Sequence, residues 1–129
     1  PLPAYERNIA GPGETSPKTA ELAFSAAMVR RYAKVSGDVN PIHLSTLTAR
    51  LFGFKRAIVH GMYSGAKAVS VLEQQAELNG KAVRLAFKRP MFVPAKALLF
   101  SEQDDETTHF SLVSGDREQA ETYFTGQIG

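Results

Sequence analysis

The chain has 129 residues, 43% of them hydrophobic and 22% charged, which is the size and composition of one ordinary globular domain. It contains no cysteine, which excludes disulfides, thiolate catalysis and every cysteine-based zinc or iron–sulfur site. No stretch approaches the roughly 18–20 consecutive apolar residues of a membrane span, and the N-terminus lacks a secretory pattern, so we expect a soluble, cytoplasmic protein.

Charge is distributed unevenly along the chain, although the net charge is only +2. Residues 1–96 hold 14 of the 15 lysines and arginines against six acids, whereas residues 97–129 hold one against seven. The basic part either attracts a phosphorylated ligand or simply presents its cations to solvent. Nucleic acid is a poorer partner, because the cations are not interleaved with aromatic residues and the acidic end would repel phosphates.

Proline and glycine are concentrated in residues 1–18, and both residue types oppose helices and sheet interiors. We predict that these residues form a leader or linker and that residues 19–129 form a single domain. Within that domain, residues 19–25 are expected to form a short strand. Residues 26–35 are expected to form a helix with Ser25 as its N-cap.

The segment that follows this helix is predicted to be irregular. Gly37 ends the helix, and Pro41 disfavours a helical conformation at Asn40. A short helical turn is then expected from Ser45 until Gly53.

The second half of the chain changes from helical to strand periodicity. Residues 61–78 have apolar residues on most sides of a helix, which predicts burial. Alternation begins at Val83, and further strands are expected at residues 97–102, 107–113 and 119–126. One long buried helix followed by about four antiparallel strands indicates an α+β fold with the sheet wrapped around the helix.

Asp38 and His43 lie on one short loop that a glycine and a proline constrain. An acid and an imidazole held on one turn can share proton transfers to and from water. A purely structural interpretation also fits, in which Asp38 and Asn40 bond the backbone of the turn and His43 caps the next helix. The predicted helix N-terminus at Gly61 would present N–H groups to an oxygen that gains negative charge.

Two other kinds of catalytic centre find little support. Residues 61–65 resemble the nucleophile elbow of serine hydrolases, but Ser64 is displaced by one position and lies inside the predicted helix. The three histidines, His43, His60 and His109, lack metal-ligand spacing, so no zinc or iron centre is expected.

Two motifs resemble those of a known family. Residues 32–43 read YAKVSGDVNPIH and are followed by Ala49, a pattern similar to the signature of the MaoC-like, or R-specific enoyl-CoA hydratase, family. Residues 58–62 read IVHGM and resemble the family's second motif, at the start of its central helix. The resemblance implies the hot-dog fold, in which an antiparallel β-sheet wraps around a long central α-helix.

The resemblance also implies a hydro-lyase reaction, the reversible hydration of trans-2-enoyl-CoA to (R)-3-hydroxyacyl-CoA. Asp38 and His43 match the catalytic pair of the family. The backbone N–H of Gly61 matches its oxyanion donor, and Asn40 matches a position that orders the catalytic loop. No metal or redox cofactor is implied, since the thioester itself acidifies the α-carbon and the helix terminus supplies the electrostatics. Coenzyme A, or acyl carrier protein in its place, enters as part of the thioester substrate.

Two other functions stay open, an acyl-CoA thioesterase with the same fold and a non-catalytic acyl-thioester binding subunit. The complete Asp38–His43 signature argues against both. Residues 46–54 resemble the catalytic half of fused family members, whose acyl groove lies between two hot-dog units. We therefore expect a homodimer or one half of a double hot-dog unit. Tyr63, just inside the central helix, either narrows the acyl site or packs in the core.

Overall fold

The computed structural model describes residues 11–13, 16–115 and 121–129, so most of the predicted leader lies outside the described residues. The described part contains a five-stranded antiparallel sheet with the strand order β1-β3-β4-β5-β2. The strands are β1 (Lys18–Phe24), β2 (Val83–Phe87), β3 (Ala95–Asp104), β4 (Thr107–Ser114) and β5 (Thr122–Ile128).

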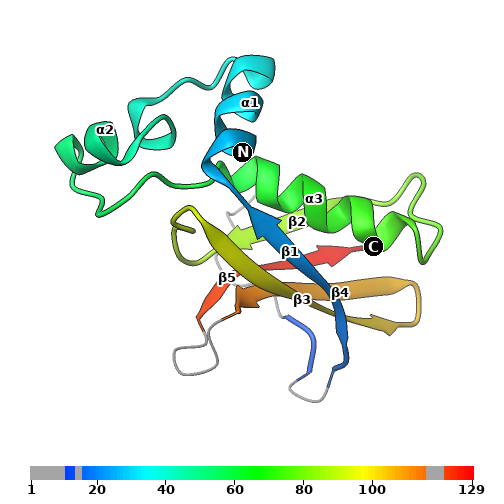
Figure 1. The fold of residues 1–129 in the computed structure, drawn as a ribbon. Helices are drawn as coiled ribbons and strands as arrows, with labels where there is room; N and C mark the ends of the chain where they lie inside the picture. The colour runs from blue at the N-terminus through cyan, green and yellow to red at the C-terminus, as the bar shows by residue number, and fades with distance from the viewer. Residues whose placement is uncertain (1–10, 14–15, 116–120) are drawn as a thin grey trace, which may run out of the picture.

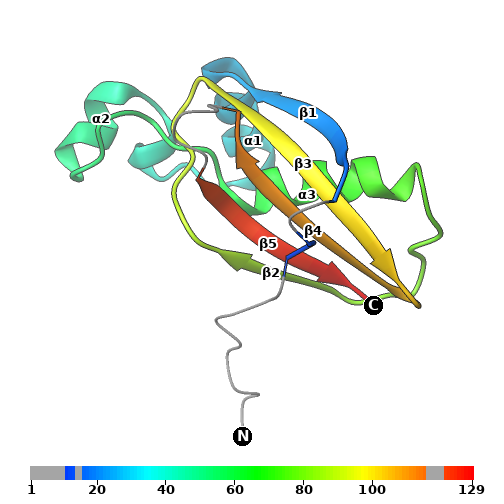
Figure 2. The same ribbon diagram turned by 90° about the horizontal axis from the view of Figure 1, so that it is seen from below.

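One long helix, α3 (Gly61–Glu73), lies against one face of this curved sheet (Figures 1 and 2). Ala68 and Leu72 of α3 belong to the same buried cluster as Phe110 of β4 and Phe124 of β5. Burying one such large apolar side chain contributes about 1.5–3 kcal/mol to folding. This arrangement confirms the predicted α+β fold with the sheet wrapped around the helix.

A glycine in β5 allows the core to close. A Cβ atom at Gly126 would lie only 2.2 Å from the ring of Phe110, so the ring packs directly on the backbone of the neighbouring strand. The rings of Phe110 and Phe124 then meet edge to face with their centroids 6.1 Å apart. The sheet face under α3 is thereby filled by aromatic side chains.

The helix that precedes the candidate site, α1 (Ala26–Ser36), begins and ends as the sequence predicts. The Ser25 hydroxyl accepts a hydrogen bond from the N–H of Met28 at 3.2 Å. Gly37 ends the helix with a φ of 80°, a conformation that costs a side-chain-bearing residue free energy. The chain therefore leaves α1 at a fixed position and enters the loop of the first motif.

Two short helices follow. A 3-10 helix, η1 (Pro41–His43), occupies part of the segment predicted to be irregular, and α2 (Thr46–Leu51) matches the predicted helical turn. Figure 1 shows that α2 projects away from the sheet. No helix in the described ranges is long and apolar enough to cross a membrane.

Some predicted boundaries are wrong. The helix expected over residues 61–78 ends at Glu73, where the backbone N–H groups of Gln74 and Gln75 turn to the carbonyls three residues back. The side chains after Leu72 are mostly exposed, so packing on the sheet no longer stabilises the helix. The last strand begins at Thr122 rather than at residue 119, which lies outside the described ranges.

Candidate active site

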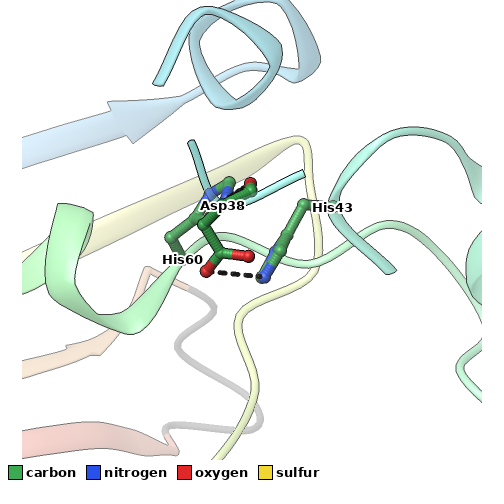
Figure 3. Close-up of side chains that lie close together, drawn as sticks. All are labelled: Asp38, His43 and His60. Carbon is green, nitrogen blue, oxygen red and sulfur yellow. Dashed lines mark hydrogen bonds and ion pairs between the residues drawn. The ribbon is translucent and has the colours of Figure 1, made fainter. Parts of the chain in front are cut away.

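Three side chains from separate segments meet beside the N-terminus of α3 (Figure 3). Asp38 lies in the loop after α1, His43 is the last residue of η1, and His60 immediately precedes α3. The two histidines are buried, with 8% and 3% of their surface exposed, whereas the Asp38 side chain is 56% exposed. The structure thus brings the predicted pair together and adds a second histidine.

The hydrogen bonds of His43 determine which ring nitrogen is available. Its Nδ1 lies 2.8 Å from the carbonyl oxygen of Ile58. A carbonyl only accepts, so we assign the proton to Nδ1, which leaves Nε2 as an acceptor in the neutral ring. That Nε2 lies 4.0 Å from Oδ2 of Asp38, which is too far for a direct hydrogen bond. Two proton acceptors therefore face each other across a short gap.

Burial lowers the pKa of His43 below its ordinary value of 6.5. The hydrogen bond to Ile58 and the charge of Asp38 act in the opposite direction, and the neighbouring His60 adds to the lowering of this pKa. His43 is therefore neutral at pH 7 and able to accept a proton.

The lowered pKa of His43 predicts how stability depends on pH. Because the unfolded chain binds a proton at His43 more readily than the folded chain, unfolding becomes easier as pH falls. The stabilisation is complete above pH 6.5 and is lost as pH falls through the folded-state pKa. We expect the free energy of unfolding, measured with urea between pH 7.5 and 5, to depend less on pH in His43→Gln than in the parent chain. Identical dependence in both proteins would contradict the assignment.

His60 contacts both members of the pair. Its Nε2 lies 2.9 Å from the backbone oxygen of Asp38, and its ring stacks on that of His43 with centroids 3.6 Å apart and planes at 17°. Its Nδ1 is buried and has no hydrogen-bond partner among the described residues. His60 is therefore tied to the site through its ring and one nitrogen only.

The same three residues could be read as a metal site, because one ligand atom from each lies within 4.8 Å of the others. The ring geometry disfavours this interpretation. Histidine binds a metal through a lone pair in the ring plane. The planes of His43 and His60 are nearly parallel with their centroids 3.6 Å apart, so their lone pairs lie in separate planes and do not converge on one ion. The arrangement suits proton transfer better than joint coordination of one ion.

A cavity of about 340 Å³ connects His43 to the start of α3. His43 and Gly61 both line it, together with largely apolar residues such as Val59 and Met91. No side chain caps the N-terminus of α3, and the first N–H groups of a helix have no partner within the helix. A Cβ atom at Gly61 would lie 3.0 Å from the ring of Phe87, so glycine keeps this end of the cavity open. The cavity therefore joins a proton acceptor to a helix N-terminus that favours negative charge.

Asn40 lies on the exposed side of the loop rather than in this cavity. Its side-chain oxygen accepts from the N–H of Ile42 at 3.2 Å, and its own N–H donates to Oδ1 of Asp38 at 3.4 Å. Both bonds hold the turn between Asp38 and η1. The alternative that His43 caps the next helix is wrong, because Ser45 caps α2.

The other side chains singled out in the sequence have structural contacts. The Ser64 hydroxyl donates to the Gly61 carbonyl at 2.8 Å inside α3, which confirms that it does not lie on a nucleophile elbow. Tyr63 stacks on Tyr32 with ring centroids 4.7 Å apart and also contacts Phe24. Tyr63 is not among the residues that line the 340 Å³ cavity, so its contacts are those of core packing.

Sequence reasoning assigned no role to His60. The spacing patterns of metal ligands do not detect two histidines that are brought together by a loop and the start of a helix. One signal was present, because His60 directly precedes Gly61 at the predicted helix N-terminus. A polar residue at that position lies next to the N–H groups at the start of the helix.

A sheet wrapped around a helix, with an acid and an imidazole beside the helix N-terminus, defines a hot-dog domain. The chain belongs to the MaoC-like domain family, whose model matches residues 8–119. This match confirms the resemblance found in the two motifs.

Two proteins illustrate what the chain resembles. The 3-hydroxyacyl-thioester dehydratase X of Mycobacterium tuberculosis is 40% identical over 91 residues, which are 69% of this chain and 31% of that protein. The (R)-specific enoyl-CoA hydratase of Aeromonas caviae is 40% identical over 73 residues, which are 54% of each protein. Both are named as a hydratase or dehydratase, which are hydro-lyases, and the sequence matches span only a third to a half of their length.

Solved structures confirm the hot-dog fold. The crystal structure of HtdX from Mycobacterium tuberculosis matches with a TM-score of 0.79 and 31% identity, over 87% of this chain and 47% of the other. The (R)-hydratase from A. caviae matches with a TM-score of 0.66 and 29% identity, over 92% of this chain and 96% of the other.

Proposed function

We propose that this domain catalyses the reversible hydration of a trans-2-enoyl thioester to an (R)-3-hydroxyacyl thioester. The observation that carries the proposal is the gap of 4.0 Å between Nε2 of His43 and Oδ2 of Asp38, beside a cavity that reaches the N-terminus of α3. The two relatives described above, a thioester dehydratase and an enoyl-CoA hydratase, support the same reaction class.

The gap is suited to holding the reacting water. If one water donates a hydrogen bond of about 2.8 Å to each acceptor, the two acceptors form an angle of about 90° at the water oxygen. This angle is close to the H–O–H angle of water. Both acceptors then draw protons away from the water oxygen while its lone pair stays free to attack. Since His43 is neutral at pH 7, it can take a proton as the C3–O bond forms.

The helix N-terminus has the complementary role. When oxygen bonds to C3, the electron pair of the C2=C3 bond moves toward the thioester carbonyl, whose oxygen becomes negative. We propose that the N–H of Gly61 donates to this oxygen, where the helix dipole adds to the stabilisation. His43 then delivers to C2 the proton that it took from the water, which returns its ring to the neutral form, and reversal of these steps gives dehydration. The reaction as proposed needs no redox cofactor, since no electrons leave the substrate, and it needs no metal, since the N–H of Gly61 and the helix dipole stabilise the negative oxygen.

One experiment separates this reaction from the alternatives. The protein is incubated with crotonyl-CoA while the absorbance of the conjugated thioester is followed, and the products are analysed by mass spectrometry and by chiral separation. Gain of one water with (R) stereochemistry supports hydration. Release of free CoA would indicate a thioesterase, and unchanged substrate retained by the folded protein would indicate a binding subunit. Either of the last two results would overturn the proposal.

A second cavity supports a phosphorylated thioester carrier. It has a volume of about 410 Å³ and shares Pro90 and Tyr123 with the first cavity, so the two adjoin. Its lining includes three cations, Lys55, Arg56 and Lys96. We propose that phosphate groups of coenzyme A or of an acyl carrier arm lie here. The basic character of residues 1–96 is then partly explained by substrate binding.

Replacing both Lys55 and Arg56 by alanine should raise KM for crotonyl-CoA by about tenfold, or ~1.4 kcal/mol, because the phosphates lose two cations. KM for crotonyl-N-acetylcysteamine, which has no phosphate, should not change. Steady-state kinetics on both substrates provides the test. Arg30→Ala with Lys34→Ala, on the exposed face of α1, removes the same charge and should change neither value. An equal rise for both substrates would contradict the assignment.

We propose that a second hot-dog unit completes the domain, either another copy of the chain or the other half of a longer protein. β2 is an edge strand, and its Val83 and Phe87 are each 45% exposed. Further large apolar side chains are exposed on and next to α2, namely Leu47, Leu51 and Phe52. Apolar surface around an open sheet edge is typical of an interface. A monomeric mass by sedimentation equilibrium, in a catalytically active sample, would contradict this proposal.

A further inference from the structure

We propose that His60 is a positioning residue, which holds the backbone of Asp38 and the ring of His43 in the arrangement needed for proton transfer. This inference rests on the proposed function, because it assigns His60 to the same reaction. His60 is only 3% exposed, whereas the Asp38 side chain is 56% exposed, so His60 acts through its neighbours rather than on the substrate.

The first observation is the hydrogen bond from His60 to the loop. Its Nε2 lies 2.9 Å from the backbone oxygen of Asp38, and since a carbonyl only accepts, Nε2 carries the proton. Its Nδ1 is then the unprotonated nitrogen, buried and without a partner in the described ranges. His60 is therefore a single-donor group whose one hydrogen bond holds the backbone of Asp38.

The second observation is a row of aromatic rings in contact, some stacked and some edge to face, that ends at His43. The rings of His43 and His60 are 3.6 Å apart, and Tyr32 of α1 contacts His60 edge to face at 4.7 Å. Tyr63 of α3 stacks on Tyr32, and Phe24 of β1 contacts Tyr63. The ring of His43 is thus supported through His60 by a helix, a second helix and a strand. Such packing fixes a catalytic ring more firmly than a loop alone.

Titratable side chains approach His60 from η1, from the loop after α1, and from α1 and α3. His43 faces it from η1, Asp38 from the loop after α1, Tyr32 from α1, and Tyr63 lies behind Tyr32 on α3. Among these groups, His43 is the one whose pKa depends on His60, because the neighbouring His60 helps to lower it. Removing the His60 imidazole should therefore raise the pKa of His43.

Two substitutions separate the hydrogen bond from the ring. His60→Phe keeps a stacked ring but cannot donate to Asp38, whereas His60→Gln places an amide N–H near the position of Nε2 without the ring. We expect His60→Phe to lower kcat for crotonyl-CoA by about tenfold or more while KM changes less than threefold. We expect His60→Gln to recover part of this loss, because the hydrogen bond to Asp38 returns while the ring contact with His43 does not. His109→Gln on β4, outside the cavity lining, is the matched control and should leave kcat unchanged.

A titration without substrate keeps this test separate from the proposed function. In His60→Gln, NMR of the His43 ring should show its pKa at a higher value than in the parent, and the acid limb of the kcat/KM profile should move in the same direction. Unfolding temperatures show whether each variant is folded. The inference is overturned if His60→Phe retains the parental kcat, or if the His43 titration is unchanged in folded His60→Gln. Inactivity of the parent would instead refute the proposed function and leave the titration valid.

Discussion

Replacement of His43 by glutamine should lower kcat for crotonyl-CoA hydration by about 10²- to 10⁴-fold, the usual contribution of a positioned general base. Glutamine is polar and similar in size, but it has no group that gains a proton near neutral pH. The acid limb of the kcat/KM profile, which in the parent reflects the lowered pKa of His43, should also disappear. Steady-state kinetics from pH 5 to 8 measures both effects.

The matched control for this prediction is His109→Gln, which makes the same chemical change on β4. It should keep the parental kcat and acid limb. A His43→Gln protein that retains activity within tenfold and still loses activity at low pH would show that another group is the base. Asp38 would be the alternative, because its carboxylate is the other acceptor at the gap of 4.0 Å.

Much of the fold follows from local sequence signals. Ser25 and Gly37 mark the ends of α1 because a side-chain cap and a positive φ are local requirements, and the structure confirms both. Alternating apolar residues likewise located the strands. The sequence does not show the end of α3, because Ala76 and Leu78 continue the apolar period, whereas in the structure the backbone turns at Gln74 and the side chains around them are mostly exposed. Helix length depends on tertiary packing, which periodicity does not report.

The candidate site was predicted in part for the same reason. Asp38 and His43 share one loop, so their closeness is visible in the sequence, and Gly61 follows from the helix start. The contact of His60 with Asp38 and His43 depends on how the loop folds back against α3, and residue spacing in the sequence does not predict this. Its stacking on His43 also changes the chemistry, because it helps to lower the pKa of the base. Long-range contacts of this kind appear only in the folded chain.

Replacement of Asp38 by asparagine should lower kcat by about 10²- to 10⁴-fold, with a pH signature opposite to that of His60→Gln. The backbone carbonyl of residue 38 can still accept from His60, and the side-chain oxygen can still accept from the N–H of Asn40. The loop should therefore stay folded while the carboxylate charge is lost. Because the charge of Asp38 raises the pKa of His43, its removal should move the acid limb of kcat/KM to lower pH.

Combining the two substitutions tests whether the pair acts as one unit. If Asp38 and His43 hold the same water, removing either one already loses the activated water, so the double variant should be no slower than the slower single variant. Asp104→Asn, at the exposed end of β3, is the matched control and should be fully active. Losses that multiply in the double variant would mean that the two side chains act in independent steps. In that case the gap of 4.0 Å would not be the position of the attacking water.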